Sequence, residues 1–183
     1  MKKILENPAY AFVIKFAALF LLWYVVYNLW LSTDTAIDLW VVKQTIGSSK
    51  FLLETFGYNV YTEGRVIGAN NSSGLFVGDN CNALVLIALF VGFILAYPGT
   101  IKRKVVYIMV GTFSIFLLNV LRISALCAID TYSRAWTEFN HSYTFNFLVY
   151  GYIFLLWYLW AERFSGVKIF APKPENSNDE QNT

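Results

Sequence analysis

The sequence predicts an all-α polytopic membrane protein with about four transmembrane helices and an extracytoplasmic segment that holds an amphipathic helix and a small β-hairpin. Hydrophobic residues make up 57% of the chain and charged residues only 14%, whereas about a quarter of the residues in a soluble domain are charged. The apolar residues also gather in four runs near the length of a spanning helix, about 20 residues. We therefore expect the lipid bilayer as a partner and no nucleic acid.

The first apolar run, residues 11–31, follows the basic start Met1-Lys2-Lys3. A secretory signal has the same order of features, but its apolar core is shorter than this run. The following Leu31-Ser32-Thr33-Asp34 also lacks the small-x-small pattern of a cleavage site. We interpret the run as an uncleaved membrane anchor and the first span.

Residues 32–81 form the predicted extracytoplasmic segment. Asp34 to Thr55 mixes apolar and charged positions, which favours an interfacial or cap helix, broken near Gly47-Ser48-Ser49. Tyr58 to Val77 contains strand-forming residues around Glu63-Gly64 and a turn sequence at 69–74, which is typical of a small hairpin. The hairpin would lead the chain back to the membrane.

Three further spans are expected over 82–97, 105–129 and 141–160, within a single membrane domain of residues 1–165. Pro98-Gly99 ends the second span, Asp130–Asn140 is expected to be a short loop, and His141 opens the fourth span. Residues 166–183 are polar and acidic, a composition that cannot form a core, so we expect a disordered cytoplasmic tail.

The distribution of basic residues predicts the orientation. Short loops rich in lysine and arginine stay in the cytoplasm, and Lys102-Arg103-Lys104 forms such a loop between the second and third spans. Both termini would then be cytoplasmic and residues 32–81 external. The expected location is the bacterial cytoplasmic (inner) membrane, with any site near Cys81 facing the periplasm or exterior.

Cys81 lies in the stretch Gly78-Asp79-Asn80-Cys81-Asn82, where a polar segment becomes an apolar helix. A helix start offers free N–H groups and a partial positive charge, which stabilise a thiolate. The position therefore indicates a reactive cysteine. The other cysteine, Cys127, lies on an apolar helix face and is expected to be a small buried side chain, although a Cys81–Cys127 disulfide remains an alternative.

Arg122 lies inside the third span, where a charge costs several kcal/mol unless it faces a partner or a wet cavity. Asn119 lies one turn deeper on a similar face, so the two residues predict a polar stripe that faces the bundle interior. A purely structural arginine, satisfied by backbone carbonyls, Asp79 or Asp130, is the alternative.

His141 is the single histidine of the chain and enters the membrane on the same predicted side as Cys81. Cysteine and histidine form the minimal pair for thiol catalysis, because the imidazole takes the thiol proton and later returns a proton to the leaving group. The sequence suggests no metal site and no cofactor.

The order of Cys81-Asn82-Ala83, Asn119-Val120-Leu121-Arg122 and His141 resembles the exosortase/archaeosortase superfamily, in particular its short bacterial members. The resemblance covers about residues 78–160. It departs from the family in having about half the spans of many members, and Asn82-Ala83 stands where many exosortases have Ser-Gly.

The resemblance implies a polytopic membrane cysteine transpeptidase or protease that cleaves C-terminal sorting tails of membrane-anchored exported proteins and transfers the product to an acceptor. Such a tail consists of a short motif, a transmembrane helix and a basic cluster. Cys81 would be the nucleophile, Arg122 the stabiliser of the thiolate or transition state, His141 the acid/base and Asn119 a supporting residue. The substrate motif, the acceptor and any accessory membrane protein stay open.

Two other classes of function remain at this point. The chain could be a non-catalytic scaffold or assembly partner in an export or surface-anchoring system, with contacts made by residues 32–82. It could also be a small transporter that uses Arg122 to bind an anion, although four spans and one intramembrane charge favour this little.

Overall fold

The computed structural model of the chain describes residues 8–26, 36–78 and 83–167. It is mostly helical, with one small antiparallel sheet. The elements follow in the order α2 (Pro8–Val26), α3 (Ala36–Thr55), β1 (Val60–Glu63), β2 (Val66–Ala69), β3 (Leu75–Phe76), α4 (Leu84–Ala96), α5 (Ile101–Asp130), α6 (Arg134–Phe139), the π-helical turn η3 (Asn140–Thr144), α7 (Phe145–Leu159) and the π-helical turn η4 (Trp160–Phe164).

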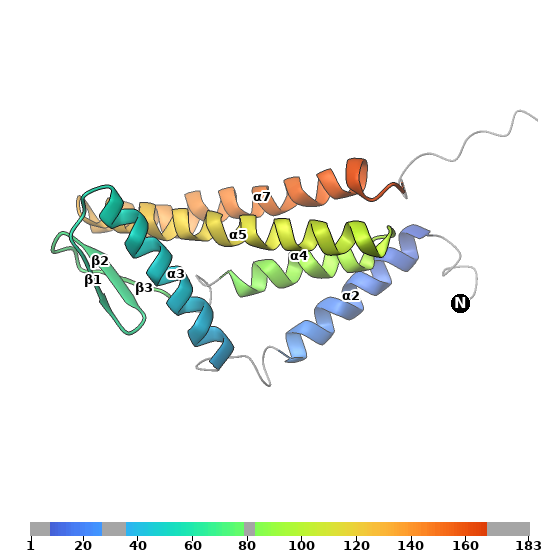
Figure 1. Cartoon of the computed structure of the whole chain (residues 1–183), viewed down its shortest axis with the longest axis horizontal. Helices are drawn as coiled ribbons and strands as arrows, with labels where there is room; N and C mark the ends of the chain where they lie inside the picture. Colours follow the sequence, from blue (N-terminus) through green and yellow to red (C-terminus); the bar gives the residue numbers. More distant parts are fainter. Residues whose placement is uncertain (1–7, 27–35, 79–82, 168–183) are drawn as a thin grey trace, which may run out of the picture.

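Helices α4, α5 and α7 run side by side along the long axis of the molecule, and α2 packs obliquely against α4 (Figure 1). Helix α3 and the sheet lie together at one end. The other end of the molecule contains the start of α2, the connection between α4 and α5, and the end of η4 (Figure 1). The two ends of the described chain are therefore on the same side of the helix bundle.

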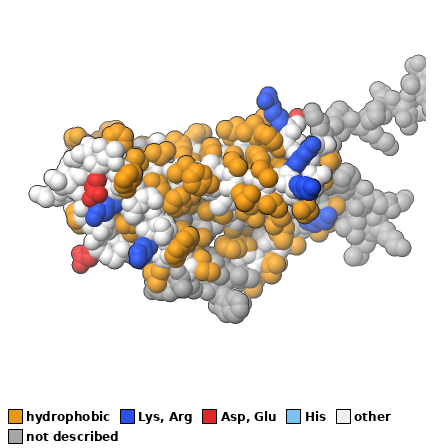
Figure 2. Space-filling view, viewed as in Figure 1, with side chains coloured by type: hydrophobic (Ala, Val, Ile, Leu, Met, Phe, Trp, Pro, Cys, Tyr) orange, Lys and Arg blue, Asp and Glu red, His pale blue; other side chains and the backbone are white. Residues whose placement is uncertain are grey.

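Two described helical segments are long and apolar enough to cross a membrane, Ile101–Asp130 and Arg134–Phe164. Helices α2 and α4 are shorter and also apolar. Hydrophobic side chains cover the middle of the visible face, whereas charged side chains gather towards its two ends (Figure 2). A continuous exposed apolar surface of this kind marks contact with lipid or another protein.

The helix bundle has its own apolar core. Phe12 of α2, Phe90 of α4, Ile115 of α5 and Ile153 of α7 are all buried in it. Aromatic rings fill the space between α4 and α7, where Phe93 stacks on Trp157 with ring centroids 4.6 Å apart. The apolar run that forms α4 is thus buried against three other helices.

A second core joins α3 and the sheet to the last turns of α5. Its buried members include Val42 of α3, Ile67 of β2, and Leu126 and Cys127 of α5. Strands β1 and β2 form the expected hairpin, with Val60 opposite Ala69 and Glu63 opposite Val66. Strand β3 pairs with β2 as the third strand of the sheet. Helix α3 and the sheet, which we call the cap, share this core with α5 and therefore rest on the end of a predicted span.

The predicted break of the cap helix near Gly47-Ser48-Ser49 was wrong, because α3 is one continuous helix over these residues. The small residues serve close packing instead. Ser49 is fully buried against α5, and its Oγ donates a hydrogen bond to the Val120 carbonyl at 3.3 Å. Small side chains allow helix backbones to approach closely, so tertiary contact overrides the local tendency to break.

The predicted loop over Asp130–Asn140 was also wrong in its second half. Ser133 caps helix α6 by accepting a hydrogen bond from the Trp136 N–H, and α6 continues through η3 into α7. The last helical segment consequently begins at Arg134, and His141 lies inside it rather than at its start.

Candidate functional site

Arg122 lies in the interior of the protein, eight residues before the end of α5. Its side chain is buried, and Nη2 donates a hydrogen bond to Asn146 Oδ1 at 3.2 Å. Asn146 in turn donates through Nδ2 to the Ser142 carbonyl at 2.9 Å. The arginine that the sequence places inside a span is therefore held by a polar group of the neighbouring helix, as a charge at this depth requires.

His141 lies in the π-helical turn η3, which is closed by a hydrogen bond from the Phe145 N–H to the Asn140 carbonyl. An i→i+5 bond of this kind makes the turn wider than an α-helical turn. Asn146, five positions after His141, lies in the first turn of α7. The imidazole and the amide that meets Arg122 therefore lie on adjacent turns of one continuous helical segment.

Arg122, His141 and Asn146 line one cleft of about 480 Å³ between α4, α5 and the last helical segment. The remaining lining residues are Val85, Leu86, Ser142, Val149 and Tyr150. One wall of the cleft is therefore the first turn of α4, the helix that follows Cys81 in the chain. The cleft combines a fixed cation, an imidazole and one side-chain amide, which can bind a carbonyl oxygen and move a proton.

The other residues selected from the sequence lie outside the described residues or do not line the cleft. Cys81 lies outside the described residues, as do Asp79 and Asn82. Asn119 is buried on α5 one turn below Arg122, and it is not among the residues that line the cleft. Cys127 has a free, buried thiol that donates to the Ile67 carbonyl at 3.6 Å, as expected of a small buried side chain.

Asn146 was missed by reasoning from the sequence. The signal was present, because Asn146 is the one amide and the one strongly polar side chain in the apolar run from Phe145 to Trp160. Polar residues within spanning helices usually mark functional or packing sites. The sequence alone, however, does not show that α7 packs with Asn146 against Arg122.

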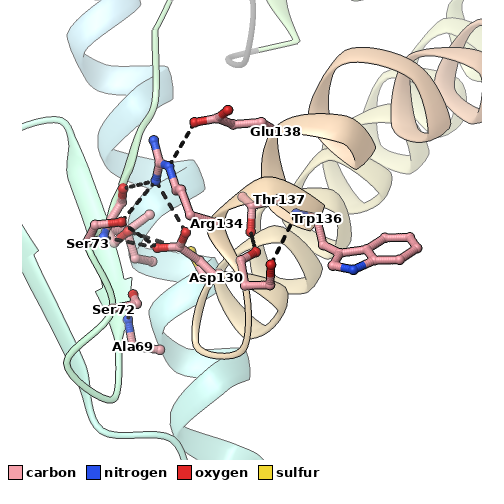
Figure 3. A network of polar contacts seen from close by, with 12 residues as sticks. Ala69, Ser72, Ser73, Asp130, Arg134, Trp136, Thr137 and Glu138 are labelled. Carbon is pink, nitrogen blue, oxygen red and sulfur yellow. Dashed lines mark hydrogen bonds and ion pairs between the residues drawn. The ribbon is translucent and has the colours of Figure 1, made fainter.

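A polar network fastens the sheet to the corner between α5 and α6 (Figure 3). The buried carboxylate of Asp130 accepts hydrogen bonds from the Gly74 N–H at 3.2 Å and from Ser73 Oγ at 3.3 Å. Arg134 Nη1 donates to Asp130 Oδ1 at 3.3 Å and to the Gly74 carbonyl at 2.9 Å. Gly74, which directly precedes β3 and lies four residues before Gly78, is thereby anchored to the helical segment that carries His141.

We expect Asp130→Ala to loosen β3 without unfolding the helix bundle. The substitution leaves the buried Gly74 N–H without its acceptor, a loss of about 1–3 kcal/mol. Hydrogen exchange followed by mass spectrometry should show exchange of peptides covering 70–78 faster by about tenfold or more. Glu138→Gln is the matched control, because the Glu138 side chain is 69% exposed at the rim of the same network. Unchanged exchange in Asp130→Ala would contradict this role of the carboxylate.

The fold and the cleft together define a class: a mostly helical protein with two described segments long and apolar enough to span a membrane, and with a buried arginine and a histidine at one polar site. A family model described as transmembrane exosortase (Exosortase_EpsH) matches residues 5–161. The chain therefore belongs to the transmembrane exosortase family. No curated protein and no solved structure is significantly similar to it.

Membership of this family implies a membrane location and the processing of membrane sorting signals. The substrates implied are proteins that carry C-terminal sorting signals. Members of the family are generally cysteine transpeptidases. The match extends over most of the chain, from before α2 to the first residues of η4.

Proposed function

We propose that the chain is a membrane cysteine transpeptidase or peptidase that cleaves the C-terminal sorting tails of membrane-anchored exported proteins and passes the product to an acceptor. One observation carries the proposal: Arg122 and His141, 19 positions apart in the sequence, line the same cleft. A scaffold has no need of such a pairing, whereas acyl transfer needs both an anion-stabilising group and an acid/base group.

The nucleophile of the proposed reaction is Cys81. Two residues separate it from Leu84, the start of α4, and the wall of the cleft includes Val85 and Leu86 of that helix. The chain limits the distance between the Cα atoms of Cys81 and Ala83 to about 7 Å, since an extended residue spans at most about 3.6 Å. Connectivity therefore supports a thiol within reach of the cleft.

The proposed topology has four spans, formed by α2, α4, α5 and the segment Arg134–Phe164, with the end that carries Lys102 and Arg103 in the cytoplasm. Arg122 is about 32 Å along the axis of α5 from Ile101, at 1.5 Å per residue. The hydrocarbon core of a bilayer is about 30 Å thick. The cleft would then lie at the outer boundary of the membrane, level with the scissile bond of a membrane-anchored substrate.

The reaction follows from these groups. The thiolate of Cys81 attacks the scissile carbonyl carbon, and the Arg122 guanidinium stabilises the negative charge that develops on the carbonyl oxygen. His141, protonated when it takes the thiol proton, gives a proton to the leaving amine as the C–N bond breaks, which leaves a thioester on Cys81. An amine or another acceptor, deprotonated by His141, then attacks the thioester and restores the thiol.

Arg122→Lys tests this proposal. Lysine retains a charge but loses the fork that bonds Asn146, so we expect the rate of processing to fall by about 10²–10³-fold, as for loss of one oxyanion donor. The assay is cleavage of a co-expressed, tagged protein that ends in a motif, a membrane helix and a basic cluster. Asn146→Ala leaves the guanidinium in place and should reduce processing less, by roughly tenfold.

All variants must reach the membrane in wild-type amounts, which immunoblots of the membrane fraction would establish. Processing by Arg122→Lys and Arg122→Ala at the wild-type rate would rule out the catalytic role of the arginine. Loss of function on replacing residues 60–76, with both arginine variants fully active, would favour the scaffold instead.

A further inference from the structure

A basic groove lies at the end of the helix bundle remote from the cleft. It is formed where α5 begins and η4 ends, and it has a volume of about 570 Å³. Lys and Arg side chains gather at this end of the visible face, beside a continuous hydrophobic surface (Figure 2). The groove is lined by Lys102, Arg103, Val106, Tyr107, Val110, Arg163 and Phe164.

The floor of the groove is held by aromatic packing between the two helical segments. The ring of Tyr107 lies 5.2 Å from that of Phe164 and 5.1 Å from that of Trp160, measured between centroids. The Tyr107 hydroxyl donates to the Leu156 carbonyl at 2.7 Å. Because Trp160 is fully buried, the groove is a fixed feature of the fold rather than a gap between independent helices.

Three cations line this groove, and no acidic residue is found among its lining residues in the described part of the chain. Lys104 belongs to the same basic run but is buried, and its Nζ donates to the Leu95 carbonyl at 2.8 Å. Lys102, Arg103 and Arg163 are exposed. Three like charges around one small apolar floor repel each other, and an anion placed between them would remove this repulsion.

The apolar part of the lining points to the kind of anion. Val106 is 57% exposed and Val110 is 64% exposed, on successive turns of α5 below the cations. Helix α5 is about 45 Å long at 1.5 Å per residue, which exceeds the hydrocarbon core of a bilayer by about 15 Å. The first turn of α5 can therefore reach the lipid headgroups while Val106 and Val110 lie beside acyl chains.

We propose that this groove is a binding site for an anionic phospholipid of the bilayer. The lipid phosphate lies between Lys102, Arg103 and Arg163, and an acyl chain lies along Val106 and Val110. Basic pockets between transmembrane helices recognise anionic headgroups in this way. The bound lipid joins the start of α5 to the end of η4, and this role is independent of the reaction proposed for the cleft.

Native mass spectrometry of the full-length chain tests the site. The protein is purified in a neutral detergent and mixed with equal amounts of phosphatidylglycerol and phosphatidylcholine. We expect one phosphatidylglycerol to be retained in preference to phosphatidylcholine. Arg103→Gln with Arg163→Gln should lower this preference by about 30-fold, because each basic side chain attracts an anionic lipid by about 1 kcal/mol. Arg103→Lys with Arg163→Lys should retain most of it.

The matched control is Lys43→Gln with Lys50→Gln, which removes the same charge from α3 at the opposite end and should leave the preference unchanged. Equal retention of the two lipids by the wild type would overturn the proposal, as would an equal loss in the control variant. A third result would also overturn it. If the wild type shows no preference for phosphatidylglycerol and the triple variant Glu175→Gln, Asp179→Asn and Glu180→Gln does, the acidic C-terminal residues occupy the groove in place of a lipid.

Discussion

Cys81→Ala is expected to abolish processing of a tagged substrate while the protein still inserts into the membrane. The thiol supplies the bond that holds the acyl group, and removal of the nucleophile from a hydrolase lowers its rate by about 10⁶-fold. Cys81→Ser should be nearly as inactive, because a hydroxyl is a far weaker nucleophile than a thiolate at neutral pH. The measurement is the ratio of shortened to full-length substrate on an immunoblot over time.

The second cysteine of the chain provides the matched control. Cys127 is fully buried with Ile67 and Ile123 in the core between the cap and α5. Cys127→Ala therefore removes a thiol and only a small part of the packing in this core. It should lower thermal stability slightly and leave processing in place. The reverse pattern, with Cys81→Ala active and Cys127→Ala inactive, would rule out Cys81 as the nucleophile.

His141→Ala is expected to reduce processing by about 10²–10⁴-fold, the range for loss of a general acid or base. Without the imidazole, the proposed acid/base is lost and the leaving amine receives its proton from water. His141→Gln keeps a similar size and a hydrogen-bonding group but cannot move a proton, so it should be equally impaired. Single-turnover cleavage of purified substrate in detergent gives the rate directly.

A neighbouring aromatic residue serves as the control for His141. Tyr143 lies two residues further in the same π-helical turn and is 67% exposed. Tyr143→Ala therefore tests whether any change to the turn impairs the protein, and it should process substrate at close to the wild-type rate. Equal impairment of His141→Gln and Tyr143→Ala would assign His141 a structural role in the turn.

Much of the architecture could be predicted from the sequence, because apolar runs and turn residues act locally. The hairpin around Glu63-Gly64 is present as expected, and the burial of Arg122 and Asn119 follows from their shared helix face. Two predictions of secondary structure were wrong, both at positions where tertiary contacts or a helix cap determine the local conformation. Small residues in α3 looked like a break, yet Ser49 packs against α5. The polar residues before His141 looked like a loop, yet Ser133 caps a helix there.

The candidate site was only partly predictable for a related reason. Arg122 and His141 could each be selected as an unusual residue in an apolar setting, and the structure brings both to one cleft. The contact of Arg122 with Asn146 depends on how α7 packs against α5, and no periodic pattern in the sequence shows which faces of the two helices meet. The role of Cys81 stays a prediction, supported by its position two residues before Ala83.

Trapping the acyl intermediate on Cys81 is the decisive experiment for the proposed reaction. Purified full-length protein is mixed with substrate, quenched in acid within a single turnover, digested and examined by mass spectrometry. We expect that the peptide containing Cys81 gains the mass of the acyl fragment of the substrate, that hydroxylamine removes this mass, and that Cys81→Ala never acquires it. Cleavage of the substrate with no adduct on Cys81, or with the adduct on Cys127, would contradict the proposed reaction.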